Sequence, residues 1–214
     1  YKHLEGKMNP SIASNMSRED VESGLSFGGF IAFECKIRAD SGIVIKALVD
    51  SGHLVGMLTG DALLTSLHVA KEVHICNSKK AYLTLQSPKD KGDMTEGGTD
   101  GVGWWFLESE TGATEKVNKK IPFDLANLLQ LAETYDFVTT EESFMNVINS
   151  TGGEQSLLWA HCGLFRVFAR MSPQGKASVI KRIQDTSEEH NVLMCGDGGN
   201  DVGALKQADV GMAL

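Results

Sequence analysis

This chain of 214 residues lacks the features that mark membrane-spanning, nucleic-acid-binding and secreted proteins. No apolar run approaches the ~20 residues that a membrane helix needs. Lys and Arg form no cluster, and the formal net charge of −8 argues against a nucleic-acid-binding face. Neither a starting methionine nor a signal peptide precedes Tyr1–Leu4, and the last residues, Val210–Leu214, are apolar. We therefore expect a piece of a longer protein, cut at both ends, that does not bind nucleic acid.

The cysteines lack the paired CxxC spacing that is typical of zinc sites. A chain of this length buries roughly 70% of its unfolded surface and needs no disulfide bonds to form a core. We therefore predict reduced, mostly buried thiols in a cytosolic compartment. The four cysteines are Cys35, Cys76, Cys162 and Cys195.

Strand and helix patterns alternate at the start of the chain and again at its end. Apolar runs at Phe27–Cys35 and His53–Leu58 predict buried strands, and helical spacing follows them at 41–51 and 61–73. The expected buried side of the second helix comprises Leu63, Leu64, Leu67, Val69 and Ala70. Later in the chain, strands are predicted at 166–169, 191–195 and 210–214 and helices at 174–184 and 200–207. This order is typical of an α/β fold, a parallel sheet flanked by helices.

The alternation is interrupted between the two halves. The range 77–164 contains a glycine- and charge-rich stretch, Lys89–Gly103, followed by the aromatic residues Trp104–Phe106. Amphipathic helices are predicted near 124–134 and 141–149. We interpret this range as an inserted α+β subdomain, in which the three aromatic side chains form either its own core or a docking patch for a partner.

The first motif that could bind a ligand is Met57–Asp61, at the C-terminal end of a predicted strand. Ligands bind at that edge of open parallel sheets. The Thr59 hydroxyl and the backbone N–H groups of a helix start suit a phosphate oxygen. A plain turn with a helix cap explains the same residues, so this motif alone does not establish a site.

The second motif is Phe168–Lys176, which also follows a predicted strand. Lys176 falls in the first turn of a predicted helix, where the helix dipole disfavours a cation. The lysine therefore gains by pointing into an anionic site, and a solvated surface lysine is the equal alternative.

The third motif is Cys195–Leu205. An apolar strand ends at Asp197, a glycine turn follows, and Asn200 and Asp201 open a helix. Carboxylates at the mouth of a sheet are the hard oxygen ligands that Mg²⁺ requires. Because two carboxylates and an amide fall within five residues, we favour a metal site over a helix cap and tight turn.

In this order the three motifs resemble the later part of the haloacid dehalogenase-like superfamily, and the stretches around them are similar to P-type ATPases. The chain is most similar to type A of the fifth P-type subfamily, the endoplasmic-reticulum members, through Phe30–Ser41 and Asn200–Gly211. The resemblance implies a Rossmann-like sheet whose phosphorylation domain comprises 27–76 and 165–214. It also implies that 77–164 is a subfamily insertion and that 1–26 is a linker or the tail of a nucleotide-binding domain.

The resemblance implies roles for residues of the first two motifs. Thr59 would hydrogen-bond an aspartyl-phosphate, and Gly60 would let the backbone approach it. Asp61 would lie near the nucleotide and Mg²⁺. Lys176 would neutralise charge on the transferring phosphoryl group. Arg38 would lie near ATP, where many P-type ATPases have Asp-Pro-Pro-Arg, but the prolines are absent here.

The resemblance also implies a magnesium site in the third motif and points to two departures from the family. Asp197 would ligate Mg²⁺, and Asn200 and Asp201 would help to position metal and phosphate. Gly199 stands where the family usually has Thr or Val. The phosphorylated aspartate of an Asp-Lys-Thr-Gly-Thr motif is missing. The nearest imitation, Asp136–Thr140, is rejected because it follows a helix and lies between the first two motifs.

The implied parent couples ATP hydrolysis to the transport of a cation or a misinserted transmembrane helix, at the cytosolic face of the endoplasmic reticulum membrane. Its other partners would be the membrane, actuator and nucleotide-binding domains of the same chain. We expect this fragment to be inactive, with at most weak affinity for Mg²⁺ and phosphate. Two alternatives remain open: a soluble haloacid dehalogenase-like phosphatase, which needs an upstream Asp-x-Asp, and a non-catalytic module that binds Mg²⁺ or phosphate.

Overall fold

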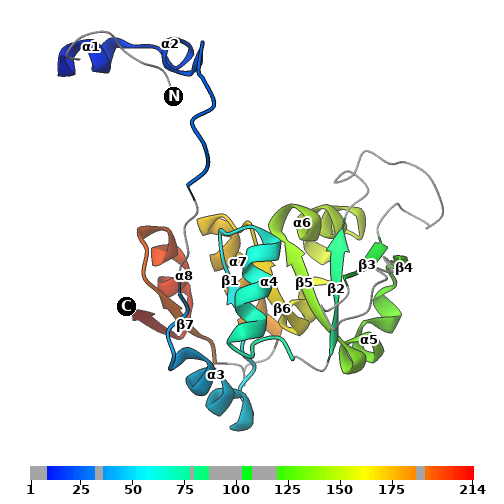
Figure 1. Ribbon diagram of the computed structural model, residues 1–214. Coiled ribbons are helices and arrows are strands. Elements are labelled where there is room, and N and C mark those ends of the chain that lie inside the picture. Colours follow the sequence, from blue (N-terminus) through cyan, green and yellow to red (C-terminus); the bar gives the residue numbers. More distant parts are fainter. Residues whose placement is uncertain (1–8, 32–35, 78–79, 87–102, 108–119, 187–190) are drawn as a thin grey trace. The chain divides into compact units, whose positions relative to one another are not determined.

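The computed structural model describes residues 9–31, 36–77, 80–86, 103–107, 120–186 and 191–214. Only the backbone is described for 103–107 and 120–122, so the prediction for the aromatic side chains Trp104–Phe106 lies outside the described part. The chain divides into two compact units, 1–36 and 37–214, and each is treated by itself (Figure 1).

The described residues of the first unit include two short helices, α1 (Pro10–Asn15) and α2 (Arg18–Glu22). The buried strand predicted for Phe27–Cys35 is wrong for its described part. Residues 27–31 adopt no strand, and Phe27 and Phe30 are exposed to 77% and 93%. An apolar run favours an extended backbone, but a strand also needs a hydrogen-bonded neighbour. The remainder of the run, including Cys35, lies outside the described residues.

The second unit contains a six-stranded sheet in the order β1-β6-β5-β2-β3-β4 (Figure 1). The first four strands in this order are parallel, and β3 and β4 are antiparallel to their neighbours. The strands are β1 (Met57–Leu58), β2 (Ala81–Gln86), β3 (Gly103–Leu107), β4 (Lys120–Pro122), β5 (Tyr135–Thr140) and β6 (Phe165–Ala169). The α/β fold with a parallel sheet is therefore confirmed. Strands from the range 77–164 extend this same sheet beyond β6.

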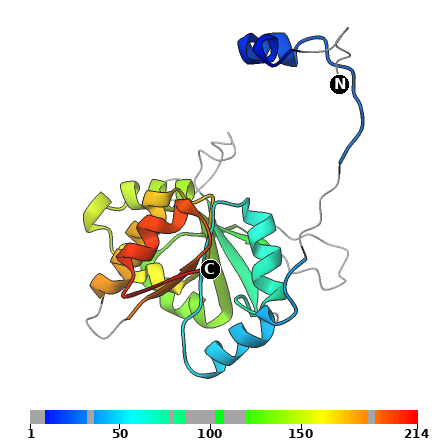
Figure 2. The ribbon, with the colours of Figure 1, turned by 90° about the vertical axis from the view of Figure 1, so that its left-hand side faces the viewer.

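Helices cover both faces of the sheet. Alternate side chains of a strand point to opposite faces, so Phe137 and Val138 of β5 enter two different core clusters. Phe137 packs with Phe144 of α6 (Glu141–Ser150) and with α7 (Pro173–Thr186). Val138 packs with Leu67 of α4 (Leu63–Glu72) on the other side (Figure 2). Ahead of β5, η2 (Leu125–Asn127) and α5 (Leu128–Thr134) form the first of the two predicted amphipathic helices.

The end of the chain forms a separate two-stranded parallel sheet, β7 (Leu193–Gly196) with β8 (Val210–Ala213). The connection between the strands is η5 (Gly199–Asp201) and α8 (Val202–Gln207), and α8 packs against α7. Within the described residues, β1 pairs only with β6 and β7 only with β8. Each of the two sheets therefore ends in an edge strand with no neighbour.

Two helices of the second unit are more exposed than their patterns suggest. The predicted helix at 41–51 is confirmed as α3 (Ser41–Asp50), yet none of its residues is buried. In α4, Leu67 and Ala70 are buried as predicted, whereas Leu64 is 72% exposed and does not belong to the buried side. The apolar pattern identified both helices, but it overestimated how many of their apolar side chains would be buried.

The described cysteines are free thiols. Cys76 and Cys162 are buried, and burial raises the pKa of each to about 12, so both are protonated at neutral pH. Cys195 is exposed, so two of the three described cysteines are buried, in agreement with the expectation of mostly buried thiols. Among the described helices, none combines the length and hydropathy that a membrane crossing requires.

Candidate functional site

Polar residues follow the C-terminal ends of four parallel strands. Thr59 comes directly after β1, Arg170 after β6, Glu141 after β5 and Asp197 after β7. The first three strands belong to one sheet, so these residues share one edge of that sheet. This is the edge at which open parallel sheets bind ligands.

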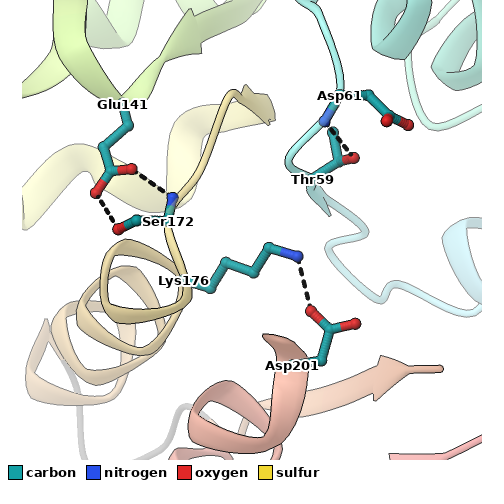
Figure 3. A network of polar contacts seen from close by, with 6 residues as sticks. All are labelled: Thr59, Asp61, Glu141, Ser172, Lys176 and Asp201. Carbon is teal, nitrogen blue, oxygen red and sulfur yellow. Dashed lines mark hydrogen bonds and ion pairs between the residues drawn. The ribbon is translucent and has the colours of Figure 1, made fainter. Parts of the chain in front are cut away.

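Backbone hydrogen bonds fix the Thr59–Asp61 turn against the end of β6. The Thr59 carbonyl accepts from the Met171 N–H at 2.9 Å, and the Asp61 carbonyl accepts from the Arg170 N–H at 3.0 Å. Within the turn, the Thr59 Oγ1 accepts from the Asp61 N–H at 3.1 Å. The Asp61 carboxylate is exposed and turned away from Lys176 (Figure 3). The hydroxyl and the turn are therefore held in place, while the carboxylate faces outward.

A buried ion pair joins the second and third motifs. The Lys176 Nζ lies 2.7 Å from the Asp201 Oδ1, and the two side chains are only 4% and 9% exposed (Figure 3). Lys176 is in the first turn of α7, and Asp201 ends η5 beside the small sheet. The pair therefore links the elements of one sheet to those of the other, and the lysine points inward.

The glycines of the third motif make room for the side chains that follow them. A Cβ added to Gly196 would lie 2.7 Å from the Asp201 Cβ, and one added to Gly198 would collide with the Asn200 Oδ1. The turn thus folds Asn200 and Asp201 back over its own backbone. A Cβ at Gly199 would meet nothing within 4 Å, so the structure accommodates a side chain at this position of the turn.

Glu141 is part of this edge, although the sequence did not single it out. Its Oε2 accepts from the Ser172 N–H at 2.5 Å and its Oε1 from the Ser172 hydroxyl at 2.8 Å (Figure 3). The sequence feature that could have identified Glu141 is its position directly after β5 and in the first turn of a helix, where a carboxylate is favoured. The residue was missed because no strand was predicted at 135–140.

Arg38 and Arg170 carry the other cationic groups of interest. The Arg38 guanidinium binds the Asp40 carboxylate, with Nη2 and Oδ2 2.8 Å apart, and both residues are exposed. The Arg38 hydrogen bond lowers the pKa of Asp40. Arg170 has a left-handed backbone, φ 54°, at the joint between β6 and α7. Arg38 is therefore engaged locally, and Arg170 is held in a conformation that is uncommon for a residue other than glycine.

The donors for a metal ion are few in the described part of the chain. No group of three or more His, Cys, Asp or Glu residues there could hold an ion. Asp197 and Asn200 are exposed on the turn, whereas Asp201 is committed to Lys176. Magnesium usually keeps several waters and takes one or two carboxylates together with phosphate oxygens. Asp197 fits such a site as one ligand, and the described residues alone do not complete the set.

A cavity of about 390 Å³ lies between α6 and α7 and is distinct from the Lys176–Asp201 pair. Its apolar wall includes Phe144, Trp159 and Phe168, and its rim carries Arg182 and Glu154, which form an ion pair. Thr59, Lys176 and Asp197 do not line it. Four residues of the second motif, Phe168, Met171, Gln174 and Gly175, do line it, so the cavity adjoins that motif and is separate from the first and third.

The chain was compared with known proteins. No family model matches the chain. The chain is 36% identical over its whole length to a probable manganese-transporting ATPase, PDR2, of Arabidopsis thaliana. It is 36% identical, over 97% of its length, to the endoplasmic reticulum transmembrane helix translocase of Saccharomyces cerevisiae. It is 28% identical over its whole length to the human polyamine-transporting ATPase 13A3. The chain spans only 16–17% of the length of these relatives.

Proposed function

The chain is homologous over its full length to P5-type ATPases, and we propose that it is the later part of their cytosolic phosphorylation domain. The whole protein would form an aspartyl-phosphate from ATP and couple its hydrolysis to transport at the endoplasmic reticulum membrane. On this proposal, 27–76 and 165–214 belong to the phosphorylation domain, 77–164 is the subfamily insertion, and 1–26 is a linker or the tail of a nucleotide-binding domain.

The observation that carries the proposal is the buried Lys176–Asp201 pair at the ligand-binding edge of the sheets. A buried charge pair has a high desolvation cost and is poor evidence for stability alone. A lysine held at a strand end beside the Thr59 turn is suited to neutralise a phosphoryl group. In this role Asp201 orients the ammonium group of Lys176.

The two open edge strands indicate where the missing nucleophile would lie. β1 ends directly before Thr59 and β7 directly before Asp197, and each strand lacks a neighbour on one side within the described residues. One further parallel strand between them would unite the two sheets. The residue at its C-terminal end would then lie between the Thr59 hydroxyl and the Asp197 carboxylate. We infer that the phosphorylated aspartate occupies this place and is supplied by polypeptide outside this chain.

The remaining roles follow from this arrangement. Thr59 and Gly60 would bind the phosphoryl oxygens, with Asn200 beside them. Asp197 would ligate Mg²⁺, which supplies charge neutralisation when bound. Asp61, which faces outward, would meet the nucleotide. Arg38 has the least support, because Asp40 occupies its guanidinium.

For the transported cargo, only a chemical class is proposed. The names of the relatives refer to manganese, to a transmembrane helix and to polyamines. A cation or a misinserted transmembrane helix remains the proposed cargo, because the two relatives at 36% identity carry those names. Their similarity to this chain lies in a segment with no membrane-crossing helix among its described residues, so the segment does not discriminate between cargoes.

The test is a phosphoenzyme assay with magnesium and radiolabelled ATP. We expect no acid-stable, hydroxylamine-sensitive label on this chain, and a label on a longer chain that carries the upstream aspartate. In that longer chain, Lys176→Ala should lower labelling by roughly 10²–10³-fold, the usual cost of removing one preorganised electrostatic group. Labelling of the 214-residue chain itself, or steady hydrolysis of p-nitrophenyl phosphate by it, would contradict the proposal and favour a self-sufficient phosphatase.

A further inference from the structure

We propose that Glu141 is a positioning residue that holds the first turn of α7 and thereby keeps the Lys176 ammonium group at Asp201. The inference rests on the proposed function of Lys176. It adds a residue from the middle of the chain, outside all three sequence motifs, to the apparatus of the sheet edge.

The hydrogen bonds form a continuous chain from Glu141 to Lys176. The Glu141 carboxylate accepts from both the N–H and the hydroxyl of Ser172, at 2.5 and 2.8 Å. Because the hydroxyl proton is given to Glu141, the lone pairs of the Ser172 Oγ are directed toward other donors. One of these donors is the Gly175 N–H, 3.0 Å from the Oγ. The Ser172 carbonyl accepts from the Lys176 N–H, also at 3.0 Å.

A steric observation independently places Glu141 against the same turn. A Cβ added to Gly175 would collide with the Glu141 carboxylate. The lack of a side chain at Gly175 is thus what allows the carboxylate to reach Ser172. The collision involves the end of a flexible side chain, so Gly175→Ala should displace Glu141 and leave the backbone in place.

The connection between β6 and α7 has an unusual backbone conformation that neighbouring contacts must stabilise. Arg170 lies in the left-handed region, φ 54°, immediately before the turn that starts α7. Residues in this region persist where the surroundings constrain them. The Lys176 side chain emerges from the first turn of α7 and reaches Asp201 at 2.7 Å, so a small shift of this turn moves the ammonium group off its acceptor.

The experiment measures the acylation rate of Lys176 by mass spectrometry, relative to that of the exposed Lys181 on the same helix. In the unaltered chain Lys176, 4% exposed, should be protected. Glu141→Gln removes the charge and one of the two acceptors. Gly175→Ala keeps the charge and moves the carboxylate. Both variants should raise the ratio of the two rates by roughly two- to tenfold, which corresponds to the loss of one hydrogen bond.

Two controls separate positioning from general loss of stability. Glu142→Gln removes the same charge from the neighbouring, exposed residue and should leave the ratio unchanged. Leu67→Ala removes core packing on the far face of the sheet and should lower the stability without selectively exposing Lys176. An unchanged ratio in both test variants, or an equal rise in the Leu67 variant, overturns the proposal. Because the assay uses neither ATP nor magnesium, its outcome is independent of the phosphoenzyme test.

Discussion

Lys176 and Asp201 show how two single residues connect separate parts of the molecule. Both side chains are almost completely buried and lie 2.7 Å apart, on α7 and η5. Taking the charges out of water is costly, and their attraction compensates only while both partners are present. The same constraint keeps the ammonium group at the sheet edge, where an anionic group would meet it.

Removal of one partner of this pair should be strongly destabilising. We expect Lys176→Met to lower the free energy of unfolding by ~3–5 kcal/mol, because it leaves the Asp201 charge buried and unpaired. The double variant Lys176→Met/Asp201→Asn should recover a large part of this loss. Urea unfolding followed by circular dichroism measures both. Lys181→Met, an exposed lysine on α7, should change stability by less than ~0.5 kcal/mol; an equal effect of the two single variants would refute the expectation.

At the scale of elements, α3 is a helix with an apolar stripe that is exposed. Ile43 is 73% exposed, Val44 54% and Leu48 39%. The helix is stabilised locally, with its last carbonyls accepting from the N–H of Ser51, and the Lys46–Asp50 pair adds an exposed interaction at i, i+4 spacing. Exposed apolar side chains contribute little, because their surface stays in water.

Polar substitution of this stripe should therefore be tolerated. We expect Ile43→Gln and Leu48→Gln each to change the free energy of unfolding by less than ~0.5 kcal/mol. Leu67→Ala in α4, a helix of equal length whose leucine is 3% exposed, should cost about 2–5 kcal/mol. Chemical unfolding of the three variants decides the point. A loss of 2 kcal/mol or more in the α3 variants, on the order seen for buried leucine, would show that this face is covered in solution.

At the scale of the whole molecule, stability depends on a buried carboxyl at the end of the sheet opposite the proposed site. Asp136, in the N-terminal part of β5, is 6% exposed, and its Oδ2 accepts from the Asn77 N–H at 2.6 Å. Burial raises the pKa of Asp136 above its ordinary value of 3.8, against the hydrogen bond from Asn77 and the attraction of Arg166. The folded protein thus binds this proton more tightly than the unfolded chain does.

This shift has a definite sign in the pH dependence of stability. As the pH rises from about 3.8 through the raised pKa, the folded state must lose a proton that it holds more tightly, so stability falls over that window. We expect Asp136→Asn to remove this decrease in stability. The decrease amounts to about 1.4 kcal/mol in the free energy of unfolding for each unit by which the pKa of Asp136 is raised. Unfolding measured from pH 4 to pH 7 tests this. Asp185→Asn, an exposed aspartate, should retain the wild-type slope; a slope that persists in the Asp136 variant would disprove the assignment.

The motifs and the fold class could be predicted from local patterns. The dipole argument gave an inward-pointing Lys176 as one of two equal alternatives, and the glycines of 196–199 predicted a close turn, because both effects act within a few residues. The partner of Lys176 could not be predicted: Asp201 was expected to help to position metal and phosphate, and its Oδ1 accepts a hydrogen bond from the Lys176 ammonium group. Glu141 was missed because it joins the edge only through the pairing of β5 with β6.

By itself, the sequence determined the order of strands and helices in 37–76 and 165–214, the α/β class and the resemblance to P-type ATPases, but not the strands β2 to β5. The order, the class and the resemblance follow from hydrophobic periodicity, glycine turns and short motifs, which are properties of neighbouring residues. Only the tertiary structure decided that 27–31 pairs with no described strand, that the stripe of α3 stays exposed, and that the molecule has two sheets with open edges beside Thr59 and Asp197. Strand pairing and burial depend on which distant segments are present to meet, and no local pattern contains that information.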